Sequence, residues 1–181
     1  MFIKKMLFLI LFLQIATVCV SQDQNQNNTF LYEGRVEKLQ NNNVVLIGSA
    51  SSVSFNFTGN ECSISLQSVD SYEHHNYVSL VLDEKYIGKI RIEKGAVQSF
   101  PIKVTSTKKE HKLEIYKNTE AHTGGVLFAG TTAKLTAISA KKRKKIEFIG
   151  DSITCGAASD GSDIPCDKGE YIDHHNGYYA Y

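Results

Sequence analysis

Apolar and polar residues alternate in short runs along most of this chain, from about residue 30 to about residue 139. Because successive side chains of a β-strand point to opposite faces, each run predicts a strand with one buried face. The runs recur roughly every ten residues with turns between them, and no apolar stripe of helical spacing accompanies them. The buried positions that they predict are Val53, Phe55, Phe57, Ile64, Leu66, Val78, Leu80, Leu82, Leu113, Ile115, Val126 and Phe128.

Turn-forming residues separate these runs. Asp83-Glu84-Lys85 precedes the run from Tyr86 to Ile92, and Gly124-Gly125 precedes Val126. Short strands joined by such turns are typical of an antiparallel β-sandwich. We therefore expect a mostly β protein whose sandwich covers residues 30–139, a length sufficient for a core of its own.

The first 21 residues have the pattern of a secretory signal peptide. Lys4 and Lys5 precede an apolar stretch from Met6 to Val20, and Ser21 supplies the small residue before a polar linker over residues 22–29. The apolar stretch is shorter than the ~20 residues of a membrane span, so the sequence predicts no span.

Secretion or export to the periplasm is therefore expected. Cys19 leaves open a lipoprotein reading, in which its thiol is lipidated after cleavage. Val18 precedes Cys19 where a lipidation signal has a small residue, so plain secretion is the favoured reading.

Charge gives little indication of a nucleic-acid partner. Removing Lys4 and Lys5 with the signal segment lowers the formal charge from +1 to −1, so the mature chain has no strong field. The basic run Lys141-Lys142-Arg143-Lys144-Lys145 resembles a nucleic-acid patch, but in a secreted chain it reads as a solvated linker over residues 140–145.

Three cysteines remain once Cys19 is removed, so at most one internal disulfide forms. Cys155 and Cys166 flank one short loop and are the expected pair in an oxidising compartment. Cys62 alternates with polar neighbours and is expected to be a small buried apolar residue. No CxxC pair is present, so no metal site built on cysteine is expected.

A different pattern begins after the basic linker. Ile146 to Ile149 is a continuous apolar run, as expected for a strand covered on both faces by helices, and it ends in Gly150-Asp151-Ser152. A polar loop follows to about Asp173, and residues 176–181 have the pattern of a helix start. Residues 146–181 thus predict the first part of an α/β domain, too short to bury a core.

Ser152 is the candidate nucleophile of that domain. Ligands and chemistry lie at the carboxyl ends of strands in open α/β sheets, and backbone N–H groups there can face a developing oxyanion. The alternative is that Ser152 only caps a helix. Capping alone does not account for the whole string from Ile146 to Gly156.

These blocks resemble carbohydrate esterase family 2, in which an N-terminal jelly-roll domain precedes an SGNH (GDS-type) hydrolase domain. The resemblance rests on five stretches: Gly34-Arg35-Val36, Gly48-Ser49-Ala50, Val53 to Gly59, His111 to Ala121 with its Lys-x-Thr-Glu-Ala signature, and Ile146 to Gly156. It departs from the family at Ala157-Ala158 and at His175-Asn176-Gly177-Tyr178.

The resemblance implies removal of acetyl groups from polysaccharides such as xylan or mannan, through an acetyl-enzyme on Ser152. Ser152 also supplies a backbone oxyanion donor, and Gly150 and Asp151 support its loop. The remaining oxyanion residues and the catalytic histidine are expected beyond Tyr181, so the 181-residue chain alone is expected to be inactive. No cofactor or metal is implied, and the sequence does not indicate an oligomeric state.

Two other functions stay open. The sandwich is also typical of a non-catalytic carbohydrate-binding module, although the chain has no Trp and offers Tyr72, Tyr77 and Tyr86 instead. An interaction protein with an esterase remnant is the third reading. Other side chains that invite a functional reading are better read as loop or packing residues: His74-His75, His174-His175, Tyr178, Tyr179 and Tyr181.

Overall fold

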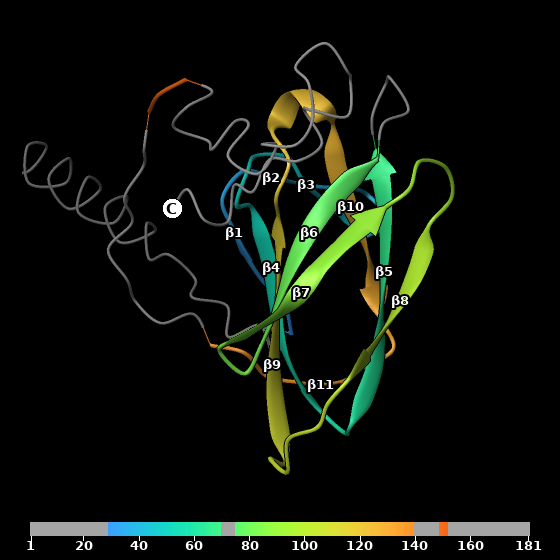
Figure 1. The fold of residues 1–181 in the computed structure, drawn as a ribbon, viewed down its shortest axis with the longest axis vertical. Coiled ribbons are helices and arrows are strands. Elements are labelled where there is room, and N and C mark those ends of the chain that lie inside the picture. The colour runs from blue at the N-terminus through green and yellow to red at the C-terminus, as the bar shows by residue number, and fades with distance from the viewer. Residues whose placement is uncertain (1–28, 70–74, 140–148, 152–181) are drawn as a thin grey trace, which may run out of the picture.

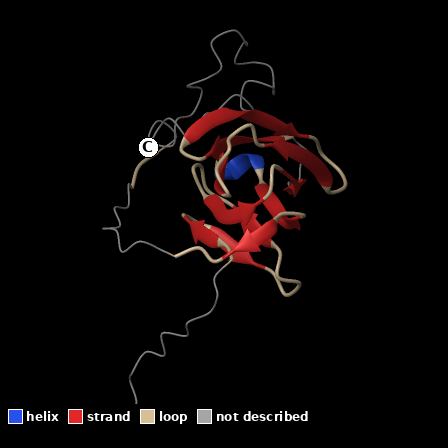
Figure 2. Ribbon diagram, turned by 90° about the horizontal axis from the view of Figure 1, so that it is seen from below, coloured by secondary structure: helices blue, strands red, loops and turns tan. Residues whose placement is uncertain are grey.

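The computed structural model describes residues 29–69, 75–139 and 149–151. Within these ranges the chain forms two packed β-sheets and one short 3₁₀ helix, η1 (Ala121–Thr123). Figure 1 shows η1 at one end of the sandwich, and Figure 2 shows it between the two layers. No described helix is long and apolar enough to cross a membrane.

Sheet A contains the strands that carry most of the long alternating runs. Its order is β1-β4-β9-β6-β7, with neighbouring strands antiparallel. A sixth strand, β11, pairs with the second half of β4 on the edge whose first half pairs with β1. The bounds are β1 (Leu31–Glu33), β4 (Ser52–Thr58), β6 (Asn76–Leu82), β7 (Lys85–Ile92), β9 (Glu110–Lys117) and β11 (Lys134–Thr136).

Sheet B lies across the core from sheet A and has the order β2-β3-β10-β5-β8. Its pairs are antiparallel, and the β5–β10 register shifts between Phe128 and Thr131. The bounds are β2 (Val36–Lys38), β3 (Val44–Leu46), β5 (Glu61–Val69), β8 (Gln98–Lys103) and β10 (Gly125–Thr131).

The core fills the space between the sheets with the inward residues of both. Every position predicted to be buried from the alternation is buried, and Cys62 joins the same cluster. Phe55 from sheet A and Phe128 from sheet B meet there, and Phe30 packs edge-on against both rings, with centroids 5.7 and 5.3 Å away. The sequence prediction of a β-sandwich with a jelly-roll fold is confirmed.

The predicted turns lie where the sequence places them. Asp83 and Glu84 have positive φ angles of 51° and 69° between β6 and β7, and Lys85 already belongs to β7. Gly125 begins β10, where an added Cβ would lie 2.4 Å from the Val45 side chain. Only glycine therefore lets β10 approach β3 at this point.

Candidate functional site

The predicted nucleophile lies at the edge of what the structure describes. Gly150 and Asp151 are exposed and outside any strand, while Ser152 lies outside the described residues. Ile149, expected in a buried strand, is 93% exposed and pairs with none of the described strands. A strand needs hydrogen-bond partners, and neither sheet of the sandwich supplies them here. Residues 146–148 lie outside the described ranges, so the predicted strand remains a prediction.

Of the three cysteines with a predicted role, only Cys62 lies in the described part of the chain. Cys155 and Cys166 lie outside the described residues, so their pairing stays a prediction. Cys62 is a buried free thiol in β5. Burial raises the pKa of this thiol, and a hydrogen bond with Thr131 opposes the shift only in part. Cys62 is thus protonated and unreactive at neutral pH. Its burial in the core agrees with the sequence prediction of a small buried apolar residue.

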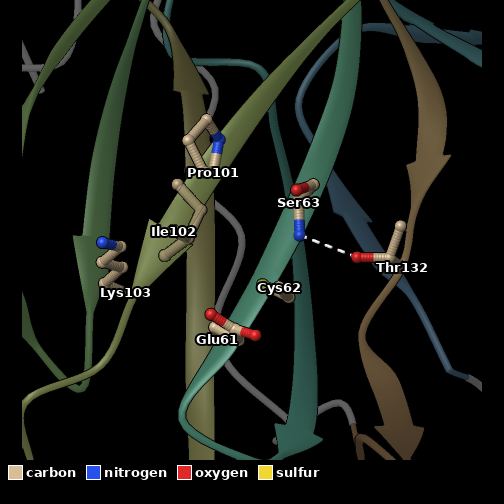
Figure 3. A pocket seen from close by; sticks show the side chains of 7 residues that line it. All are labelled: Glu61, Cys62, Ser63, Pro101, Ile102, Lys103 and Thr132. Carbon is tan, nitrogen blue, oxygen red and sulfur yellow. Dashed lines mark hydrogen bonds between the residues drawn. The ribbon is translucent and has the colours of Figure 1, made fainter.

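A pocket with both polar and apolar side chains lies beside β5 and β8 of sheet B (Figure 3). Its volume is about 380 Å³, and the Ser63 amide donates a 2.8 Å hydrogen bond to Thr132 Oγ1 at one side. The lining residues are Glu61, Cys62, Ser63, Pro101, Ile102, Lys103 and Thr132. They include no histidine that would activate Ser63, so the pocket lacks the parts of a serine hydrolase site.

The Lys-x-Thr-Glu-Ala signature lies at the η1 end of the sandwich and is built around Lys117. Inward positions of β9 are otherwise apolar or aromatic, yet the inward Lys117 is fully buried. Its Nζ donates hydrogen bonds to the carbonyl oxygens of Thr119, at 2.5 Å, and Glu120, at 2.8 Å. The buried ammonium therefore fixes the turn between β9 and η1, because a buried charge requires such partners.

Asn76 joins this turn to both sheets. Its Nδ2 donates to Ser68 Oγ of sheet B, at 2.9 Å, and to the Thr123 carbonyl of η1, at 3.0 Å. Its Oδ1 accepts hydrogen bonds from the hydroxyls of Thr119 and Thr123. Every donor and acceptor of the Asn76 side chain is thus used. We call Ser68, Asn76, Lys117, Thr119 and Thr123 the inner polar cluster.

The inner polar cluster was not anticipated from the sequence as a unit. One residue indicated a buried polar group in the sequence: Lys117 continues the alternation of Leu113 and Ile115, so it occupies a position expected in the core. Asn76 carries no comparable signal, since it lies at the first position of β6 and its partners come from three other elements. The cluster orders the end of the sandwich and has no nucleophile with an adjacent base.

The tyrosine and histidine candidates lie outside the core where the structure describes them. Tyr77 is half-buried, with the Lys89 ammonium 5.0 Å from its ring centroid and the His75 ring edge-on at 5.4 Å. Tyr86 is exposed on β7. Tyr72, His74, His174, His175, Tyr178, Tyr179 and Tyr181 lie outside the described residues. No group of three potential metal ligands is arranged around a common point in the described part of the chain.

Comparison with known proteins gives these features a context. Residues 32–141 match the family described as Carbohydrate esterase 2 N-terminal. A cellulase/esterase, CelE, from Acetivibrio thermocellus is 32% identical over 148 residues, which are 78% of this chain and 17% of CelE.

Solved structures agree with the sequence match. A family two carbohydrate esterase from Clostridium thermocellum, in complex with cellohexaose, aligns with a TM-score of 0.70 and 28% identity over 84% of this chain and 46% of that one. A family two carbohydrate esterase from Cellvibrio japonicus has the same fold, with a TM-score of 0.68 and 19% identity over 84% of this chain and 44% of that one. This chain thus spans less than half of the length of these solved relatives.

Proposed function

The chain belongs to the carbohydrate esterase 2 N-terminal family, and from this premise we propose that it is the N-terminal part of a secreted serine esterase that removes O-acetyl groups from polysaccharides. The main support for this proposal is the position of the Gly-Asp-Ser motif directly after the family match. The family match ends at residue 141, and within about ten residues the chain reads Gly150-Asp151-Ser152. A family 2 sandwich is therefore followed directly by a GDS-type nucleophile motif.

In the proposed reaction, Ser152 Oγ attacks the acetyl carbonyl carbon of the substrate. A histidine, proposed to lie after Tyr181 in the full-length protein, takes the serine proton and passes it to the sugar oxygen that leaves. Water then hydrolyses the acetyl-serine ester and releases acetate. The backbone N–H of Ser152 is one of the donors that stabilise the oxyanion, while Gly150 and Asp151 shape the loop.

The substrate class is an acetylated polysaccharide or oligosaccharide of the xylan or mannan type. Residues 1–21 act as the signal peptide that brings the enzyme to this substrate. No step of the proposed reaction needs a metal or a cofactor.

The test is acetate release by the full-length protein from acetylated xylan and acetylated mannan. Ser152→Ala is expected to lower the rate by ~10³-fold or more, because it removes the covalent route altogether. Ser159→Ala is the matched control, since it removes a serine hydroxyl from the same segment and is expected to retain activity. Normal activity in Ser152→Ala would show that the nucleophile assignment is wrong.

A further inference from the structure

The outward face of sheet A carries a row of small and polar side chains across four strands. The registers place Ser52 opposite Tyr116, Tyr116 opposite Ser79 and Ser79 opposite Lys89, from β4 through β9 and β6 to β7. Directly opposed residues of neighbouring strands share a face, so these four side chains form one outward row. Asn118 continues the outward side of β9, because its amide donates to the Tyr77 carbonyl in line with the β6–β9 ladder.

Three members of this row, Ser52, Ser79 and Asn118, are buried, although they lie on the side of the sheet away from the core. Ser52 is 4% exposed, and both Ser79 and Asn118 are fully buried. Among the described residues, none forms a hydrogen bond with Ser79 Oγ or with either polar atom of the Asn118 side chain. Buried polar groups in native proteins are almost always hydrogen-bonded, and an unsatisfied one costs about 1–3 kcal/mol. The row therefore has the character of a contact surface.

The chemistry of the row indicates its partner. A primary amide with a free oxygen and a free NH₂ group matches the hydrogen-bonding groups of a peptide backbone. The row ends at β7 on the exposed side chains of Lys89 and Arg91. Residues 152–181 follow the described chain and carry five carboxylates against one lysine, Lys168. That acidic segment is complementary to the two cations of this edge, of which Arg91 also forms an ion pair with Glu93, at 2.8 Å.

We propose that the outward face of sheet A, centred on Ser79 and Asn118, is the docking surface for residues 152–181 of the same chain. The sandwich then holds the segment that begins with Ser152 through backbone hydrogen bonds to Asn118 and Ser79 and through carboxylate contacts to Lys89 and Arg91. This deepens the proposed function by giving the sandwich a role in placing the nucleophile loop. The docking itself is independent of whether Ser152 is the nucleophile.

Hydrogen–deuterium exchange on the 181-residue chain tests the docking without any activity readout. Peptides from residues 152–181 are expected to exchange at least tenfold more slowly in the chain than in a synthetic peptide of the same sequence. Ser79→Arg places a long cation on the buried row and is expected to abolish that protection. Ser65→Arg is the matched control, because Ser65 lies on β5 of sheet B and is expected to leave the protection unchanged.

A second variant covers the case in which Ser79→Arg fails to fold, as judged by circular dichroism. Lys89→Glu with Arg91→Glu changes only exposed side chains of an edge strand and is expected to weaken the protection of residues 152–181. The proposal is overturned if the segment exchanges as fast as the free peptide. It is also overturned if a folded Ser79→Arg chain and the double variant both keep full protection. Acetate release in the Ser152→Ala experiment bears on the proposed function alone.

Discussion

The inner polar cluster and the outward row of sheet A both bury polar side chains, but in the row Ser79 and Asn118 have no hydrogen-bond partner among the described residues. Asn76 and Asn118 make the comparison direct, since both are fully buried asparagines. Every polar atom of the Asn76 side chain is hydrogen-bonded, whereas neither polar atom of the Asn118 side chain has a partner among the described residues.

The difference between Asn76 and Asn118 indicates two roles for buried polar side chains: stabilising the fold and binding a partner. A satisfied network inside the sandwich specifies one arrangement of β5, β6, β9 and η1, and it contributes to the stability of the fold. A buried amide without partners lowers that stability by about 1–3 kcal/mol, and this cost is recovered only when a partner binds. An asparagine therefore stabilises the fold on the inward side of sheet A, and another asparagine provides a binding surface on the outward side.

The largest expected effect comes from Asn76→Leu. The substitution keeps the side-chain volume roughly constant and removes the hydrogen bonds that Asn76 forms with Ser68, Thr119 and Thr123. We expect a loss of about 3 kcal/mol in unfolding free energy, measured by urea denaturation, and a fall in Tm on the order of 10 °C. A loss below about 1 kcal/mol would show that the inner polar cluster does not hold the sandwich together.

Asp83→Asn is expected to have an intermediate and pH-dependent effect. The Asp83 carboxylate, with its side chain 12% exposed, lies 2.8 Å from His111 Nδ1 and accepts a hydrogen bond from the Lys112 amide. Desolvation raises the pKa of Asp83, but the hydrogen bonds from His111 and Lys112, with the nearby charges of Lys108 and His111, bring the pKa below its usual range. The ionised form is therefore favoured by folding.

The sign follows from this lowered pKa. Asp83 stabilises the fold above the unfolded pKa of about 3.9, and the contribution is lost as the pH falls through the lower folded value. Wild type is expected to have the higher Tm at neutral pH, and the difference from Asp83→Asn is expected to vanish in strong acid. A difference in Tm that is the same at every pH would contradict the assignment.

The smallest expected effect comes from Asn118→Leu, the matched partner of Asn76→Leu. Replacing an amide without partners by an apolar side chain removes the desolvation cost of the amide, so the unfolding free energy of the sandwich is expected to stay the same or to rise by about 1 kcal/mol. Urea denaturation under the same conditions measures it. A destabilisation as large as that of Asn76→Leu would remove the distinction between the two regions.

The sandwich was predictable from the sequence because its signal is local. Alternation in runs such as Val53-Phe55-Phe57 reports burial directly, and turns such as Asp83-Glu84 mark the strand ends. Strand order was not predictable in this way, since β4 lies beside β9 and β1 through pairings that join distant residues. The short strands β1, β2, β3 and β11 have too few residues for a periodic pattern.

The site was predictable only in part. Gly150-Asp151-Ser152 was predicted as a site because the motif consists of consecutive residues, and it stays a prediction because Ser152 lies outside the described residues. The inner polar cluster and the outward row depend on residues that meet only in the fold, such as Ser79 and Tyr116. Lys117 at an inward position was the one local signal of the cluster, and serines at outward positions of β4 and β6 were the signal of the row.

An experimental structure of the 181-residue chain tests the central claim most directly, because it shows what contacts Asn118 and Ser79. The account predicts that the Asn118 side-chain amide lies within about 3.2 Å of backbone atoms from residues 152–181. It also predicts carboxylates of that segment beside Lys89 and Arg91. A structure in which ordered water alone meets Asn118 and Ser79, with residues 152–181 away from sheet A, would contradict it.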